Sequence, residues 1–142
     1  MSKEEKLLNE WIERLGLQDW AIVLRYNCKP EELRLENVNG EAEYVSSVKS
    51  AVIRLLDPKY DEDGITKYDL EEIIVHELLH IKFSIIGINP KDFASAVVDE
   101  TIHRIIDDLA RAFVNAKRNK TGRALNCERI IDKNKARISV NE

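Results

Sequence analysis

Several signatures are missing from this chain of 142 residues, and each absence excludes a class of protein. No run comes near the roughly 18 apolar residues that a membrane-spanning helix needs, so we expect no membrane partner. The first residues are charged and no apolar segment follows them, so we expect a cytoplasmic protein without a secretory signal. The two cysteines, Cys28 and Cys127, are isolated, which excludes a paired-cysteine zinc motif or a disulfide framework.

The length allows one domain with a hydrophobic core and leaves little room for a second module. The net charge of −4 is unevenly distributed along it. Residues 1–114 carry 14 basic and 23 acidic side chains, a balance of −9, whereas residues 115–142 carry eight and three, a balance of +5. We therefore divide the chain into a domain at 1–117 and a basic tail at 118–142. The acidic body argues against a nucleic-acid partner.

Hydrophobic periodicity predicts an α+β fold with an N-terminal helix, a small three-stranded sheet and two long helices that carry a metal site. The expected elements are a helix at 3–15, strands at 20–26, 40–47 and 50–56, a helical turn at 31–35, and long helices at about 67–86 and 90–117. Asp63 or Thr66 is expected to cap the first long helix.

Histidine is also scarce, and all three histidines lie between positions 76 and 103. Two of them belong to the motif His76-Glu77-Leu78-Leu79-His80, which lies in the first long helix. Residues four apart share one face of a helix, so both imidazoles can bind one Zn²⁺. Glu77 points about 100° round the helix, where it can hydrogen-bond a zinc-bound water without ligating the metal. The alternative is a chance match on an amphipathic helix.

A catalytic zinc site needs a third protein ligand and an open fourth position for water. Glu100 lies on the next helix, 20 residues after His80, and a turn at Gly87–Pro90 can bring its carboxylate opposite the imidazoles. His103 is the rival ligand, because it lies one turn from Glu100 and close to the same face. The plainer interpretation of His103 is a histidine on the helix surface or beside the ligands. We expect Glu100 to be the ligand and Zn²⁺ to be the cofactor.

An H-E-x-x-H motif followed by a glutamate on the next helix resembles the gluzincin family of zinc metallopeptidases. The short chain looks most like the minimal gluzincins, or minigluzincins, over roughly residues 5–115. The resemblance implies a zincin-like fold in which His76, His80 and Glu100 hold zinc and Glu77 is the catalytic base. It also implies a substrate-binding edge strand, which we expect to be the strand that contains Ala51, Val52 and Ile53.

The sequence departs from thermolysin-like gluzincins at one position. Those enzymes carry an acidic residue four positions after the ligand glutamate, where it orients a zinc-bound imidazole, and the matching residue here is Arg104. Arginine cannot accept the imidazole proton, so a neighbour such as Asp107, or a backbone carbonyl, must do so. A His103 ligand would instead suit the SprT-like metalloproteases.

The function that these residues predict is zinc-dependent hydrolysis of peptide bonds in a peptide or protein substrate. Zinc lowers the pKa of its bound water from about 15.7 towards 7. Glu77 then takes the proton of this water and delivers it to the leaving amine. The candidates for the group that stabilises the transition state are Tyr44, Tyr68 and His103.

Two other functions stay open. One is a zinc-binding regulator or interaction module with little turnover, and the other is a DNA-associated SprT-like protease, which only the basic tail supports. The opposite charges of tail and body also predict that residues 118–142 dock on the domain and inhibit it, since a tether makes the encounter intramolecular. Cys127, Glu128 or Asp132 could then displace the zinc-bound water. A solvated tail is the alternative.

Overall fold

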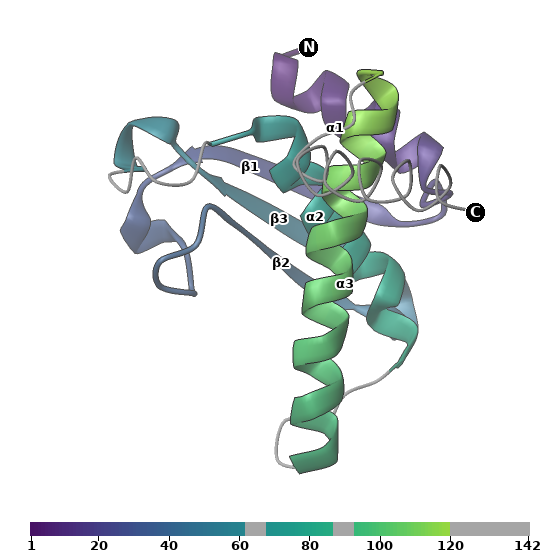
Figure 1. The fold of residues 1–142 in the computed structure, drawn as a ribbon. Coiled ribbons are helices and arrows are strands. Elements are labelled where there is room, and N and C mark those ends of the chain that lie inside the picture. The colour runs from purple at the N-terminus through teal and green to yellow at the C-terminus, as the bar shows by residue number, and fades with distance from the viewer. Residues whose placement is uncertain (62–67, 87–92, 120–142) are drawn as a thin grey trace, which may run out of the picture.

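A computed structural model describes residues 1–61, 68–86 and 93–119 of the chain. The helices and strands, in chain order, are α1 (Lys3–Arg14), β1 (Ala21–Cys28), β2 (Gly40–Val45), β3 (Ser50–Leu56), α2 (Leu70–Lys82) and α3 (Phe93–Lys117). Figure 1 shows α1 and the sheet behind the long helix α3. The predicted α+β class is therefore confirmed as three helices and a three-stranded sheet among these residues.

Helix α1 begins at a capping box in which the Ser2 hydroxyl accepts the N–H of Glu5 and the Glu5 carboxylate accepts the N–H of Ser2. Its apolar face buries Leu8 and Trp11. The backbone of Gly16 just beyond it has a φ of 69°, a left-handed conformation that glycine adopts without strain. The helix predicted at 3–15 is thus confirmed.

The sheet has the order β1-β3-β2, in which β3 pairs with β1 in parallel and with β2 antiparallel. Strand β3 is therefore central, and the prediction that Ala51, Val52 and Ile53 form a substrate-binding edge is wrong. The physical reason lies in composition: β3 buries alternate apolar side chains, whereas β2 is more exposed and carries the partly exposed Glu43. Charged side chains are one of the features that protect the edge of a sheet.

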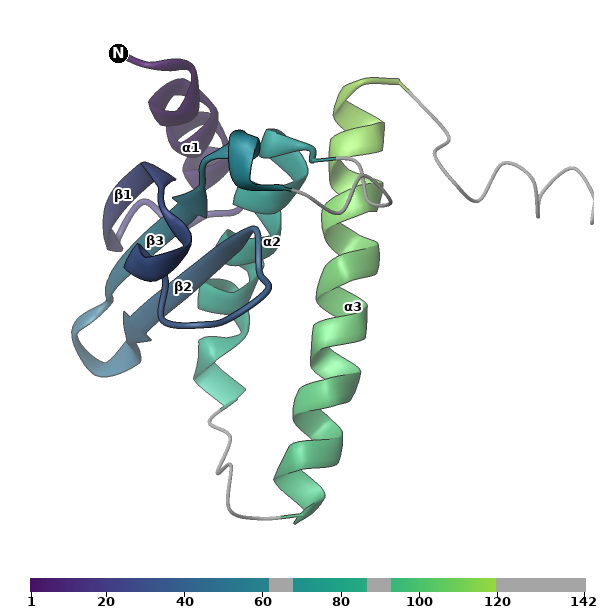
Figure 2. The same ribbon diagram turned by 90° about the vertical axis from the view of Figure 1, so that its left-hand side faces the viewer.

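Helix α2 contacts α1, α3 and the sheet, and Figure 2 shows it between the strands and α3. Its buried side chains are Glu71, Ile74, Val75, Glu77, Leu78, Leu79 and Ile81. The helix is shorter than predicted, because Asp69 caps it by accepting the N–H of Glu72 at 3.2 Å. The predicted cap is therefore corrected to Asp69, and Asp63 and Thr66 lie outside the described residues.

The two halves of α3 pack differently. The buried side chains of its C-terminal half are Ile106, Ala110 and Val114, which contribute to the core. Residues 96–101 are exposed, and Figures 1 and 2 show this end of the helix projecting beyond the rest of the domain. Among the described residues, no helix is both long enough and apolar enough to cross a membrane.

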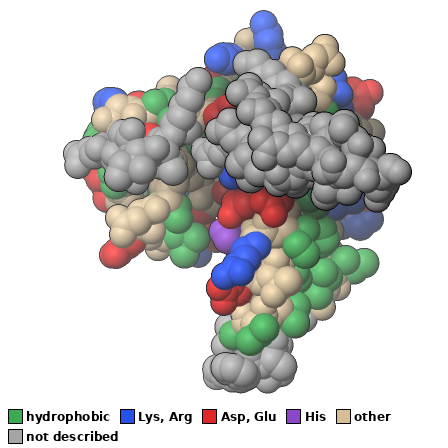
Figure 3. All heavy atoms as spheres, viewed as in Figure 1, with side chains coloured by type: hydrophobic (Ala, Val, Ile, Leu, Met, Phe, Trp, Pro, Cys, Tyr) green, Lys and Arg blue, Asp and Glu red, His purple; other side chains and the backbone are tan. Residues whose placement is uncertain are grey.

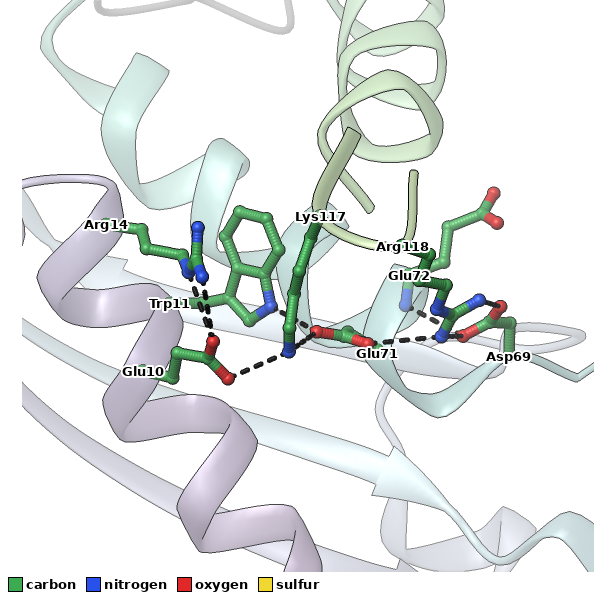
Figure 4. A network of polar contacts seen from close by, with 8 residues as sticks. All are labelled: Glu10, Trp11, Arg14, Asp69, Glu71, Glu72, Lys117 and Arg118. Carbon is green, nitrogen blue, oxygen red and sulfur yellow. Dashed lines mark hydrogen bonds and ion pairs between the residues drawn. The ribbon is translucent and has the colours of Figure 1, made fainter. Parts of the chain in front are cut away.

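A group of charged side chains and one tryptophan, which we call the anchor network, joins the start of α2 to the end of α3 and to α1 (Figure 4). Its members are Glu10, Trp11, Asp69, Glu71, Lys117 and Arg118. The buried Glu71 carboxylate accepts the Trp11 indole N–H at 2.7 Å, pairs with Lys117, and accepts Arg118 at 3.1 Å. Arg118 also makes two hydrogen bonds to Asp69, at 2.6 and 3.0 Å.

The anchor network holds the first residue of the predicted tail, Arg118. Cys127, Glu128 and Asp132, which could displace a zinc-bound water, lie outside the described residues. The predicted inhibition by residues 118–142 therefore stays a prediction.

Candidate metal centre

Helix α2 presents His76 and His80 on one face, as their spacing of four residues predicts. Their Nε2 atoms lie 3.0 Å apart, and both side chains are partly buried. Tetrahedral coordination at about 2.0–2.1 Å places ligand nitrogens roughly 3.3 Å apart, so the pair has nearly the separation that one metal ion needs.

Helix α3 brings the third histidine to this pair. The His103 ring centroid lies 5.0 Å from that of His76 and 5.2 Å from that of His80. Each of the three imidazoles offers a nitrogen, and these nitrogens all lie within 4.8 Å of one another. Figure 3 shows histidine surface, in purple, beside α3 and next to acidic side chains.

The structure does not bring Glu100 to the imidazoles. Its side chain is 70% exposed and pairs with Arg104 at 3.0 Å, one turn along the same helix. Glu100 precedes His103 by three residues, which is about 4.5 Å of helical rise towards the projecting end of α3. In the described structure the rival residue His103, and not the expected ligand Glu100, completes the triad.

Asp107 lies where an acceptor for a ligand imidazole is needed. Its Oδ1 is 2.9 Å from Nδ1 of His76, and its Oδ2 is 3.9 Å from Nε2 of His103. When the carboxylate accepts the Nδ1–H of His76, the lone pair is left on Nε2, which faces His80. Asp107 therefore orients the His76 imidazole with Nε2 towards His80, whereas Arg104 pairs with Glu100 on the surface.

Burial keeps the two α2 imidazoles neutral. It lowers the pKa of His80 to about 4, and the neighbouring His76 and His103 act in the same direction. Burial also lowers the pKa of His76, although Asp107 opposes this shift. Metal binding requires neutral imidazoles, so at neutral pH these two side chains need to lose no proton before they bind.

Glu77 is buried beside the histidines, and only 5% of its surface is exposed. Burial, together with the nearby carboxylates of Glu41 and Asp107, raises its pKa to about 8. The start of β2 passes directly over this side chain: a Cβ on Gly40 would lie 3.3 Å from Oε1 of Glu77 and 2.7 Å from Cγ2 of Ile73. Glycine at position 40 therefore allows the strand to approach the helix this closely.

The three histidines line a cleft of about 530 Å³. Its lining residues come from α2, β2, α3 and the segment before β2. Figure 2 shows α2 between the strands and α3. The lining of the cleft includes Leu35, Val38, Gly40, Tyr44, Glu72, Glu77, Asp107 and Arg111. The strand that borders the cleft is therefore the edge strand β2.

The tyrosines proposed for the transition state lie in different places. Tyr44 lines the cleft and is 43% exposed. Tyr68 donates its hydroxyl to the carbonyl of Leu56 at 2.7 Å and does not line the cleft, and burial raises its pKa to about 12. Of the two, only Tyr44 can contact a molecule bound in the cleft.

No role in the cleft was predicted from the sequence for Gly40, Glu72 or Arg111. Gly40 was predicted only as the start of a strand, and Glu72 was not singled out. Arg111 was missed although it lies four residues after Asp107, a spacing that places both on one face of α3. That spacing was the available signal.

Comparison with protein-family models, curated proteins and solved structures finds no match for this chain. The function is therefore argued from the geometry of the cleft.

Proposed function

We propose that this protein is a zinc-dependent peptidase whose metal is held by His76, His80 and His103. The observation that carries the proposal is the convergence of three imidazole nitrogens within 4.8 Å, in the lining of an open cleft and beside a buried glutamate. Three histidines with a free fourth position are a ligand set of catalytic zinc sites. Bound there, zinc supplies a Lewis acid that polarises a carbonyl and acidifies water.

Glu77 acts as the proton carrier in this proposal. Its carboxylate accepts a proton from the attacking water and donates it to the leaving amine. A base of this kind works best when its pKa lies near the working pH, and burial moves the pKa of Glu77 to about 8. A nearby cation will lower this value, because it favours the charged carboxylate.

The edge strand β2 supplies the binding surface for a peptide. The outer edge of β2 has no strand partner among the described residues, because its pairing in the three-stranded sheet is with β3. An extended peptide can add to such an edge through main-chain hydrogen bonds. This role replaces the one expected for Ala51, Val52 and Ile53.

The test is a comparison of the purified chain with Glu77→Gln. Both proteins are expected to bind zinc, and only the first is expected to cleave a peptide library. Equal cleavage by both would contradict the role of Glu77. Zinc binding without cleavage by either would support the alternative of a zinc-binding regulator with little turnover.

A SprT-like, DNA-associated protease is the second candidate, because a His103 ligand is the feature that suits that class. The excess of acidic side chains over residues 1–114 argues against a nucleic-acid-binding face on the domain. DNA binding that weakens with salt, and that disappears when residues 118–142 are removed, would favour this candidate. A cytoplasmic location stays an expectation from the sequence.

A further inference from the structure

Arg111 is a charged side chain of the cleft whose role the proposed reaction leaves open. It lies on α3, lines the cleft and is 30% exposed. Its nearest carboxylate contacts are 3.7 Å from Nε to Glu72 and 3.6 Å from Nη1 to Asp108, and both exceed hydrogen-bonding distance. Its buried Nε has no hydrogen-bond partner among the described residues. Nearby charges therefore hold the guanidinium in place without a hydrogen bond to either carboxylate.

Arg118 shows what a structural arginine looks like on the same helix. It lies seven residues after Arg111, about two turns along, and it also faces the start of α2. Arg118 makes three hydrogen bonds, two to Asp69 and one to Glu71. The difference between the two arginines indicates that Arg111 is not merely an ion-pair partner for α2.

The position of Arg111 relates it to the metal centre. His103, Asp107 and Arg111 follow one another at intervals of four residues, so they form one column on the cleft side of α3. From Asp107 to Arg111 the helix rises about 6 Å, and long helical side chains lean back towards the N-terminus, here towards His103. An extended peptide advances about 3.4 Å per residue, so a rise of about 6 Å corresponds to roughly two residues of such a peptide.

Other charged groups that line the cleft are already engaged. Glu41 accepts the backbone N–H groups of Arg34 and Leu35 and pairs with Arg54, and Asp107 contacts His76. Glu72 is 31% exposed on its side chain and can be hydrated, whereas Nε of Arg111 is buried. Among the described residues that line the cleft, Arg111 is the one Lys or Arg side chain, and it is 30% exposed and lies beyond hydrogen-bonding distance of Glu72 and Asp108. A planar guanidinium binds a carboxylate through paired hydrogen bonds.

We propose that Arg111 determines substrate specificity by binding a carboxylate of the peptide, so that the preferred substrates carry an acidic side chain or a free C-terminus within three residues of the cleaved bond. This inference rests on the proposed peptidase function. The Glu72 carboxylate competes for the same guanidinium, so its charge weakens the preference for substrates that carry a carboxylate.

The experiment uses the zinc-loaded full chain and quenched fluorescent peptides built around a cleavage site found in a library. Each peptide carries Glu or Gln at one of the three positions on either side of the bond, and a matched pair ends in a carboxylate or an amide. The readout is the ratio of kcat/KM between the two members of a pair. We expect one position, or the C-terminal pair, to show a ratio of about ten, as expected for a charged hydrogen bond. The peptide pair that shows this ratio identifies whether Arg111 binds an acidic side chain or the C-terminal carboxylate.

Variants separate this role from a structural one. Arg111→Gln should reduce the ratio to about one, Arg111→Lys should keep part of it, and Glu72→Gln should increase it by removing the competing charge. If the Arg111–Glu72 ion pair only supports the fold, Arg111→Gln and Glu72→Gln should instead change the kcat/KM ratio in the same direction. Arg118→Gln is the control, because it removes an arginine from the same helix and should leave the ratio unchanged. Zinc content and melting temperature are measured for every variant.

Failure of this proposal is distinguishable from failure of the peptidase function. Cleavage with no preference at any position, or a preference that survives Arg111→Gln, overturns the role of Arg111 and leaves the peptidase intact. If no peptide is cleaved, the same pairs are tested for binding to zinc-loaded Glu77→Gln with and without Arg111→Gln. A preference for carboxylates that depends on Arg111 would then uphold the binding role alone, and its absence would overturn both.

Discussion

The two ends of the α2–α3 helix pair differ in how their polar groups are satisfied. At the anchor network, the Glu71 carboxylate is matched by Lys117, Arg118 and the Trp11 indole. At the candidate metal centre, two imidazole nitrogens face each other at 3.0 Å, and the third histidine lies on a half of α3 whose side chains are largely exposed. The polar groups at the first end are satisfied by one another, whereas the second end gathers three imidazoles in the lining of an open cleft.

This difference indicates which residues stabilise the domain and which residues serve its proposed function. Buried charges that have all their partners are costly to break singly, because the remaining partners stay buried without compensation. Groups that await a ligand contribute little to the fold before the ligand arrives. Substitutions at the anchor network should therefore change stability, and substitutions at the metal centre should change binding and turnover.

The largest expected effect on stability comes from Glu71→Ala. It leaves Lys117 and the Trp11 indole without this acceptor, and we expect a loss of about 3–5 kcal/mol in the free energy of unfolding. Glu72→Ala is the control, since its half-exposed side chain should cost less than about 1 kcal/mol. Urea denaturation followed by circular dichroism measures both. Equal losses would show that the anchor network does not act as described.

Gly40→Ala should have the next largest effect. The added methyl group meets Ile73 at 2.7 Å and Glu77 at 3.3 Å, so we expect a cost of about 1–3 kcal/mol from overpacking. The cost should fall in an Ile73→Ala background, because the closest contact is then gone. A double-mutant cycle in urea measures this. A cost that stays the same in both backgrounds would contradict the close approach of β2 to α2.

A smaller effect is expected from pH on the metal-free protein. Burial raises the pKa of Glu77 from 4.5 to about 8, so its contribution to stability is complete below pH 4.5 and is lost as pH rises to about 8. The lowered pKa values of His76 and His80 act only below about pH 6.5, where falling pH removes stability. Between pH 6.5 and 8 we therefore expect a decrease of up to about 2 kcal/mol.

Denaturation of the chelated protein across this pH range measures the effect. The control is Glu77→Gln, which removes the titrating group and should flatten the curve between pH 6.5 and 8. A wild-type curve that is already flat in this range would contradict the burial of Glu77.

Local patterns predicted the helices and the His76–His80 pair, because the spacing of four residues acts within one helix. They did not predict which side chain of α3 reaches that pair, because Glu100 and His103 lie less than one helical turn apart. The position of α3 is set instead by the packing of Ile106 and Ala110 in the core. Strand order is also non-local, so Ala51–Ile53 could not be placed at the centre of the sheet from its own residues. The anchor network joins residues up to 107 positions apart, as Glu10 and Lys117 show.

The smallest effect on stability is expected from Glu100→Ala. Its side chain is 70% exposed and pairs only with the exposed Arg104 in the described structure, so the change should lie within about 0.5 kcal/mol. Thermal denaturation of the metal-free protein measures it. A loss above about 2 kcal/mol would show that Glu100 has a buried role that its exposed position does not explain.

The most direct test of the metal centre is the zinc content of purified protein after dialysis, measured for the wild type, His103→Ala and Glu100→Ala. The described geometry predicts one zinc per chain for the wild type and for Glu100→Ala, and loss of stoichiometric zinc for His103→Ala. Circular dichroism of each sample shows that the fold is retained. Full zinc in folded His103→Ala, with loss of zinc in Glu100→Ala, would contradict the three-histidine site.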